Sequence, residues 1–329
     1  MEPPVSVLDL SPVGAGVSPS QAIRDSVELA RTAERLGYTR YWVAEHHNMA
    51  SIAASAPEVL IAHVAASTEK IRMGAGGIMI PNHSPLHVVE VFRTLEALHP
   101  GRIDLGLGRA PGTDPVTSAA LRRSDDPEVN HLLAEILAFE RDEFPEGHPF
   151  RAITPMPSDV RIGELWMLGS TLSGASIAAQ LGMRYAFAGH FAMRQAADAI
   201  AHYRRQFRPS PQLAAPYAML AVTCICGEDD DDARRLAAPV RVAIAKSRTG
   251  KRAPILSIED ALAYRFTPEE QAIADDFLHG AVIGGPADVA PRLRTLATDL
   301  GADELMLSML LPSVAIRCAS LARIAAAMG

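Results

Sequence analysis

The stretch KIRMGAGGIMIPNHSPLHVVEVFRTLEALHPGRIDLGL (residues 70–107) decides the fold class. Its first part (70–80) is an apolar run that predicts a strand, and its last part (102–107) predicts a second strand. Between them, residues 85–101 carry apolar side chains at helical spacing. A strand, a crossover helix and another strand make up the repeating unit of parallel sheets. We therefore expect an α/β protein.

The same alternation continues along the chain. Apolar and β-branched runs predict eight strands, at 5–10, 40–44, 70–80, 102–107, 164–168, 183–188, 217–227 and 303–310. Helical patterns lie between them, and the first has a start signal at Ser18 and a stop signal at Gly37. Eight such units without an obvious linker favour a closed (β/α)8 barrel, folded as one domain over 1–329, over an open doubly wound sheet.

Two segments interrupt this rhythm. Residues 109–127 are rich in Pro, Gly and Asp and predict a long loop after the fourth strand. Residues 247–285 form an insertion between the seventh strand and the last crossover helix. Extra segments of this length in a compact fold often act as lids or substrate-binding elements.

Composition and charge narrow the class of protein. The chain has 329 residues, 48% of them hydrophobic, and a net charge of -7, which is typical of a soluble globular enzyme without a basic surface for nucleic acid. The opening MEPPVSVLDL lacks the features of a secretory signal, and no apolar run approaches the ~20 residues that span a bilayer. We therefore expect a cytoplasmic protein with neither membrane nor nucleic-acid partners.

The cysteines agree with a reducing compartment. There are three of them, at 224, 226 and 318, an odd and low number that gives no disulfide framework. Because side chains alternate along a strand, Cys224 and Cys226 are expected to share one face of the seventh strand as packed thiols.

Three titratable residues, Glu45, His46 and His47, directly follow the second strand. In a barrel of this kind the carboxyl ends of the strands build the active site, so these residues are candidates for it. Alternation along an extended chain points Glu45 and His47 one way and His46 the other. A metal site would need ligands from other parts of the chain, and this alternative stays open. The histidines available for it are His83, His87 and His190.

Glycines and small polar residues follow other strands. Gly76 and Gly77 inside the third strand suggest that something approaches the backbone closely, although a plain β-bulge is the alternative. In LGSTLSGASIAAQLG (168–182) a strand ends, and a small-residue loop leads to a helix that begins near Gly174. The free N–H groups of a helix N-terminus bind anions, unless a serine simply caps the helix. Arg109 would add a positive charge there, whereas GLGRAPG is a poor match to a Rossmann fingerprint.

Several of these stretches resemble the bacterial luciferase-like flavin monooxygenases, in particular their small single-chain members. The resemblance rests on YWVAEHHNM, on GAGGIMIPNHSPLHVVEVFRTLEALHPGRIDLGLGRAPGTD and on LGSTLSGASIAAQLGMRYAFAGHF, and it covers nearly the whole chain. It implies a (β/α)8 barrel with an FMN site at the carboxyl rim, and commonly a homodimer. The segments 109–163 and 247–285 match least specifically, and substrate recognition would vary there.

The resemblance also implies roles for particular residues. His46 corresponds to an active-site histidine beside the flavin ring, and Gly76–Gly77 to a cis peptide beneath it. The phosphate-binding positions, together with the strand end that carries them, correspond to Arg109, Leu168, Gly169, Ser170 and Ser173. Gly108 stands where luciferase has a reactive cysteine, which argues against light emission. Gly169 replaces an acidic residue of luciferase.

The sequence thus predicts a monooxygenase that uses O2 and reduced FMN, supplied by a separate flavin reductase, to oxidise an unidentified small organic substrate. His46 would act as hydrogen-bond partner or general base, and Glu45 would orient a neighbouring group. Three alternatives remain: hydride transfer with the deazaflavin F420 on the same fold, flavin binding without turnover, and a metal-dependent barrel enzyme that uses Glu45, His46 and His47. For a homodimer, the apolar helices 57–66 and 86–98 are the expected contacts.

Overall fold

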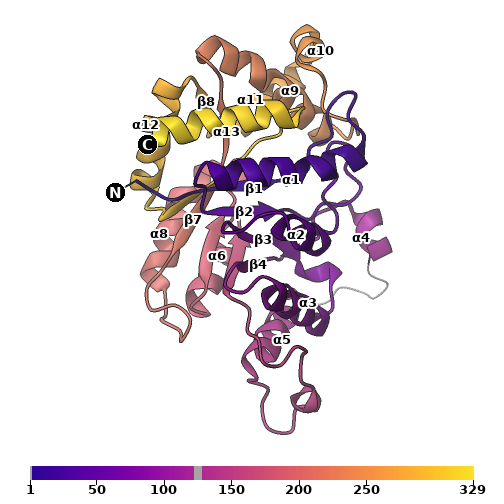
Figure 1. Ribbon diagram of the computed structural model, residues 1–329, viewed down its shortest axis with the longest axis vertical. Coiled ribbons are helices and arrows are strands. Elements are labelled where there is room, and N and C mark those ends of the chain that lie inside the picture. The colour runs from indigo at the N-terminus through magenta and orange to yellow at the C-terminus, as the bar shows by residue number, and fades with distance from the viewer. Residues whose placement is uncertain (1, 122–127) are drawn as a thin grey trace.

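The computed structural model describes residues 2–121 and 128–329, and its centre is a closed parallel barrel (Figure 1). Strand β1 pairs with both β2 and β9, and β6 pairs with β7, which closes the ring of eight. The (β/α)8 prediction is therefore confirmed. The barrel strands are β1 (Val5–Asp9), β2 (Arg40–Val43), β3 (Arg72–Met79), β4 (Ile103–Gly108), β5 (Glu164–Gly169), β6 (Arg184–Phe187), β7 (Ala218–Cys226) and β9 (Glu304–Ser308).

Helices surround the barrel and begin at the signals that the sequence offers. The Ser18 hydroxyl accepts a hydrogen bond from the Gln21 N–H (3.1 Å) and caps α1. The Asp229 carboxylate caps α9 through the Asp232 N–H (2.8 Å). The main helices are α1 (Pro19–Arg35), α2 (Pro57–Ala65), α3 (Pro85–Leu98), α5 (Val129–Arg141), α6 (Leu172–Gln180), α8 (Ala196–Gln206), α9 (Asp230–Arg248), α12 (Pro286–Leu300) and α13 (Val314–Met328).

The segment expected as a long loop contains a short helix, α4 (Pro115–Leu121). Asp114 explains it, because its carboxylate accepts hydrogen bonds from the N–H groups of Val116 and Thr117 (both 3.1 Å). An Asp-Pro pair can therefore start a helix in a stretch whose composition predicts a loop. The remainder of the expected loop, 122–127, lies outside the described residues.

The insertion after β7 folds into α10 (Ile258–Ala263), α11 (Pro268–Leu278) and a three-residue strand, β8 (Val282–Gly284). Both helices pack against α9. Strand β8 extends the sheet beyond the closed ring, since it pairs with the last residues of β7 (Cys224 opposite Val282). It was not predicted, because three residues are too few to show a period.

The Glu270 carboxylate ties the insertion together. It accepts hydrogen bonds from Lys251 Nζ (2.7 Å), from the Tyr264 hydroxyl (2.9 Å) and from the Thr267 N–H (3.0 Å). These contacts fix the segment before α10 and the start of α11 to each other.

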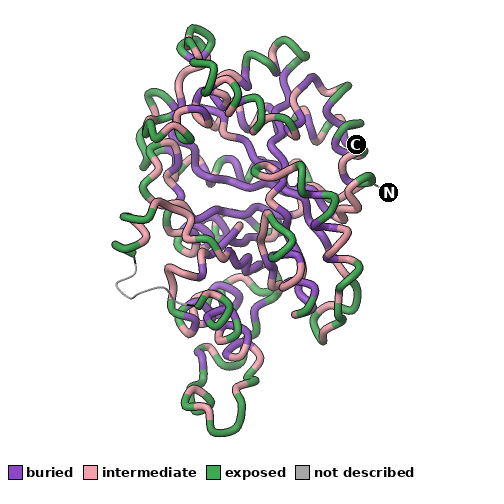
Figure 2. Tube along the Cα trace, turned by 180° about the vertical axis from the view of Figure 1, so that it is seen from behind, coloured by how far each residue is buried: buried purple, intermediate pink, exposed green. Residues whose placement is uncertain are grey.

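The interior is apolar, and the strands are its most buried part (Figure 2). Every residue of β2, β4 and β7 is buried. Cys224 and Cys226 are free thiols buried on β7, as expected, and burial raises the pKa of both. No helix in the described part of the chain has the length and apolarity to cross a bilayer.

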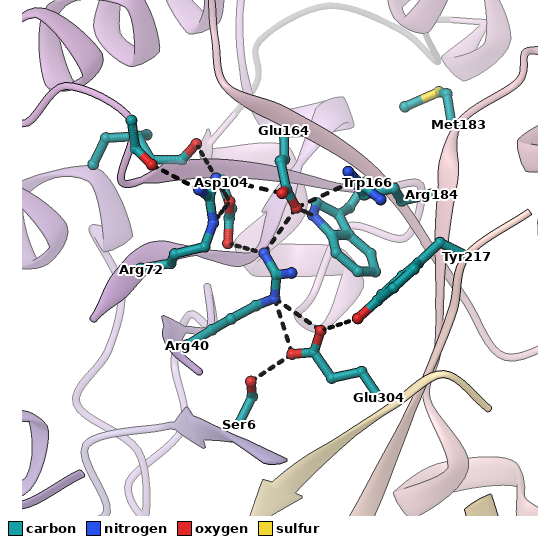
Figure 3. Close-up of polar contacts among 12 residues, drawn as sticks. Ser6, Arg40, Arg72, Asp104, Glu164, Trp166, Met183, Arg184, Tyr217 and Glu304 are labelled. Atoms are coloured by element: carbon teal, nitrogen blue, oxygen red, sulfur yellow. Dashed lines mark hydrogen bonds and ion pairs between the residues drawn. The ribbon is translucent and has the colours of Figure 1, made fainter. Parts of the chain in front are cut away.

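An ion network closes the barrel at the amino-terminal ends of the strands (Figure 3). Arg40 lies at its centre, with 2.9 Å to Asp104, 2.8 Å to Glu164 and 2.9 Å to Glu304. Three cations therefore meet three carboxylates. The two remaining cations of the network are Arg72 and Arg184.

Two indole rings lie against this network. Trp42 and Trp166 pack edge to face with centroids 5.2 Å apart, and the Trp42 N–H donates to Asp104 (2.9 Å). The guanidinium of Arg40 lies 4.9 Å from the Trp166 ring centroid. The interior of the barrel at this end is therefore filled with packed rings and paired charges.

Candidate functional site

A hollow at the carboxyl ends of the strands, here called the main cavity, encloses about 1000 Å³, including solvent at its mouth. Its wall is mostly apolar and comes from nearly every strand of the barrel. This is where a (β/α)8 barrel places its active site. Of the site residues predicted from the sequence, those in its wall are His46, Gly76, Arg109, Leu168, Gly169 and Ser170. Those beside it are Glu45, Gly77 and Ser173.

His46 lies in the loop after β2 and contributes its ring to the cavity wall. Its backbone N–H donates to the Ala54 carbonyl (2.9 Å), which fixes the residue in the loop. The ring Nδ1 is buried and has no partner among the described residues. Burial lowers the pKa of His46 to about 4, against the opposing charge of Glu45. The imidazole is therefore neutral near pH 7 and free to hydrogen-bond a ligand.

A second histidine, His190, lines the same cavity. It belongs to the short helix α7 (Gly189–Ala192) that follows β6, and its buried Nδ1 also lacks a partner in the described structure. Burial lowers the pKa of His190 to about 4, and the nearby His46 adds to this. From the sequence, His190 was predicted to follow a strand and was considered only as a possible metal ligand. His190 comes to lie near His46 because the closed barrel brings the loops after β2 and β6 to the same rim.

Glu45 points away from the cavity and is fully buried. It accepts hydrogen bonds from the Met79 N–H (2.8 Å) and the Asn82 amide (2.9 Å). The His47 and His83 rings each contact it at 2.9 Å. Burial alone would raise the pKa of Glu45, but the hydrogen bond and charge of His83 and the other donors lower it. The carboxylate thus joins the loop after β2 to the end of β3.

This arrangement confirms the expected alternation, with Glu45 and His47 on one side of the chain and His46 on the other. It also bears on the metal alternative. The residues that the structure describes contain no group of three or more His, Cys, Asp or Glu side chains placed to hold a metal ion.

The floor of the main cavity includes Gly76, and the Gly76–Gly77 peptide bond is cis. A Cβ on Gly76 would lie 2.8 Å from the Leu8 side chain. A Cβ on Gly77 would lie only 2.6 Å from the Gly106 carbonyl oxygen. The backbone contact leaves room for glycine alone at position 77, whereas a side chain at position 76 would require the Leu8 side chain to move.

One corner of the cavity is suited to an anion. Helix α6 begins at Leu172, two residues earlier than expected, and its N-cap Thr171 makes no side-chain capping bond. The Arg109 guanidinium reaches this corner and donates to the Ser173 hydroxyl (3.1 Å). Uncapped N–H groups at a helix start, hydroxyls such as that of Ser170 and one arginine together favour a phosphate or carboxylate.

A second hollow, here called the side cavity, adjoins the main cavity and encloses about 850 Å³. The two share wall residues, among them His46, His190 and Phe191. Helices α9 and α11 form its outer wall, so the insertion does contribute to the site region. The sequence could not place this wall, because it depends on the packing of the insertion against the rim.

Comparison with known proteins gives the family to which this chain belongs. Residues 4–304 match the family model of luciferase-like monooxygenase, and the chain belongs to that family. The resemblance noted in the sequence is thereby confirmed, as is the expectation of an enzyme of this family.

Relatives of known name support the assignment. A luciferase-like monooxygenase of Escherichia coli (strain K12) is 40% identical, with 92% of this chain and 90% of the relative covered. The N-acetyl-S-alkylcysteine monooxygenase of Bacillus subtilis (strain 168) is 43% identical over 56% of each chain. The crystal structure of apo-MsnO8 superposes with a TM-score of 0.91 at 36% identity, covering 99% of this chain and 98% of that one.

More distant solved structures share the fold alone. They include the oxygenating constituent of 3,6-diketocamphane monooxygenase in complex with FMN (16% identity, TM-score 0.73). They also include an F420-dependent secondary alcohol dehydrogenase (16% identity, TM-score 0.69).

Proposed function

We propose that this enzyme is a flavin-dependent monooxygenase that uses reduced FMN and O2 to oxidise a small organic substrate. Reduced flavin would supply two electrons, so that one oxygen atom enters the substrate and the other leaves as water. The observation that carries the proposal is the main cavity, which combines an anion-binding corner at one end with the neutral, unpartnered His46 in its wall.

The residues of the main cavity fit FMN. Gly76 leaves the floor free of side-chain atoms, which suits the close approach of a flat ring. Arg109, Ser170 and the first turn of α6 would hold the phosphate, with Gly169 and Leu168 forming the strand end beside it. We also propose that Ser173 contributes, through its hydrogen bond with Arg109.

His46 would hold or move a proton at the reacting group. A neutral imidazole has one ring N–H and one bare nitrogen, so it donates a hydrogen bond and also accepts a proton. We propose that Glu45 acts as a positioning residue, since its carboxylate holds the loop that carries His46 and does not reach the cavity.

We further propose a transient flavin reductase as the source of reduced FMN, a homodimer as the assembly and the cytoplasm as the compartment. Val59 of α2 and Leu98 of α3 support the dimer, being 64% and 63% exposed on the two helices expected to form the contact. The free thiols agree with a reducing compartment.

The test is a titration of the protein with FMN and with F420, each reduced anaerobically, followed by a pulse of O2. We expect FMN to bind and Arg109→Ala to weaken its binding about tenfold or more. In His46→Ala, oxygenation of a substrate should fall about 10²-fold or more with FMN affinity unchanged. His131→Ala, at an exposed helix position, is the control.

Several outcomes would contradict the proposal. Exclusive binding of F420 would replace FMN with the deazaflavin. Unchanged FMN affinity in Arg109→Ala and Ser170→Ala together would remove the phosphate assignment. Full turnover in His46→Ala would remove the histidine from the reaction.

A further inference from the structure

The side cavity has an apolar wall that the barrel alone does not provide. Val240 and Ile244 of α9 face it from one side, Phe277 of α11 from another, and Met49 and Ile52 of the loop after β2 complete it. Such a wall binds the apolar body of an organic molecule. Because the two cavities share wall residues, a ligand here would lie next to a cofactor bound in the main cavity.

Polar groups without partners lie in the side-cavity wall. Thr223 of β7 and Ser308 of β9 are neighbours in register, and each is 5% exposed. In the same wall, Nδ1 of His46 and Nδ1 of His190 are buried atoms without a hydrogen-bond partner in the described structure. Buried polar groups normally have such partners. The two ring nitrogens therefore point to a ligand with a polar function near the junction of the two cavities.

The charges of the two cavities are unusual for an acidic protein. No carboxylate is among the described residues that line either cavity, although the chain carries a net charge of -7. Histidines apart, Arg109 in the main cavity and Arg248 in the side cavity are their charged residues. Because Arg109 is assigned to the proposed phosphate corner, Arg248 is the arginine available to bind a second anion.

Arg248 occupies the last turn of α9, at the open rim of the side cavity. Its guanidinium makes no ion pair or hydrogen bond with any residue that the structure describes. A cation in this turn also stabilises the helix dipole, but Lys246 does so too while its ammonium lies 5.1 Å from the Tyr264 ring, away from the cavity. The cavity position therefore distinguishes Arg248 from its neighbour.

We propose that the side cavity binds the organic substrate, that this substrate has an apolar body and a carboxylate, and that Arg248 binds the carboxylate at the rim. The atom to be oxidised then lies at the junction, where His46 and His190 line both cavities. The inference rests on the proposed monooxygenase function for the reaction, but not for the binding. The substrate named for the Bacillus subtilis relative, an N-acetyl-S-alkylcysteine, has this form.

Calorimetric binding of N-acetyl-S-hexylcysteine and of its methyl ester, with and without FMN, tests the proposal. The acid should bind about tenfold more tightly than the ester, since a charge-assisted bond to arginine is lost in the ester. Arg248→Met should abolish this difference, and Lys246→Met should keep it. Equal affinities of acid and ester in the unaltered protein, no binding of either, or a preference that survives Arg248→Met would overturn the inference.

A second variant tests the body of the cavity. Ile244→Trp fills the apolar space, so both probes should bind about tenfold more weakly while FMN affinity changes by less than about twofold. Probe binding like that of the unaltered protein would show that the ligand lies elsewhere. The FMN titration is independent of the probes, so loss of flavin binding would refute the proposed function, and loss of probe binding alone would refute only this inference.

Discussion

Adjacent residues in this chain have opposite environments. Glu45 is saturated with hydrogen-bond donors, whereas the Nδ1 atom of His46 has none among the described residues. The alternation of an extended chain predicted this division, and the carboxyl-end rule predicted that His46 would reach the cavity. The position of His190 was not predictable, because its proximity to His46 arises only when the barrel closes and its rim brings together the loops after β2 and β6.

The Glu45–His83 contact gives a prediction about stability and pH. The pKa of Glu45 is lowered, so its contribution is present above about pH 4.5 and is lost as pH falls through its folded-state pKa. The pKa of His83 is raised by Glu45, so its contribution is present below about pH 6.5 and is lost as pH rises through its folded-state pKa. The pair therefore stabilises the fold most between about pH 4.5 and 6.5.

Glu45→Gln should lower the free energy of unfolding by about 3 kcal/mol in that pH window, and by less near pH 8. Urea denaturation at several pH values measures this. Asp142→Asn, which breaks the exposed pair with Arg161, is the control and should cost less than about 1 kcal/mol. A loss from Glu45→Gln that does not change with pH would show that the ion pair with His83 contributes nothing.

At the scale of elements, the sequence predicted all eight barrel strands to within two residues at each end. Each is a short apolar run between helical patterns, and that signal is local. Strand β8 and helix α4 were not predicted for different reasons. The first is too short to have a period, and the second depends on hydrogen bonds from one carboxylate, that of Asp114, within a stretch of loop-like composition.

Helices α2 and α3 present a groove whose wall includes Val59, Ala62, Leu95 and Leu98. If a second copy of the chain covers this groove, charged substitutions there should separate the copies. We expect the unaltered protein to elute with about twice its 35.2 kDa mass, and Val59→Asp with Leu98→Asp to elute near the single mass.

Light scattering coupled to size-exclusion chromatography measures the masses of the proposed dimer and its variant. Val116→Asp is the matched control, because Val116 is 80% exposed on α4, a different element. A single-chain mass for the unaltered protein, or a double mass that persists in the charged variant, would exclude this groove as the dimer contact.

At the scale of the molecule, the two ends of the barrel have separate tasks. The amino-terminal end holds the ion network around Arg40, and the carboxyl end holds the cavities. The sequence indicated the end of the barrel at which the cavities lie, but the network joins residues up to 264 positions apart and has no local signature. The side cavity could not be predicted from the sequence for the same reason.

Arg40→Met should lower the free energy of unfolding by about 3–5 kcal/mol, because it leaves buried carboxylates without their shared partner. FMN affinity should stay the same in the folded fraction. Arg194→Met, which removes an exposed pair with Asp276, should cost less than about 1 kcal/mol. Arg184→Met, at a more exposed position of the network than Arg40, should give an intermediate loss if the Arg40 variant does not fold. Equal stability of all three variants would show that the network is unimportant for the fold.

The ion network and the two indole rings also determine where molecules can enter and leave the barrel. Since the amino-terminal end of the barrel is filled, coenzyme, starting material and product all have to enter and leave at the carboxyl end, where both cavities open. A product that remains at the junction of the two cavities would therefore also slow the exchange of spent coenzyme.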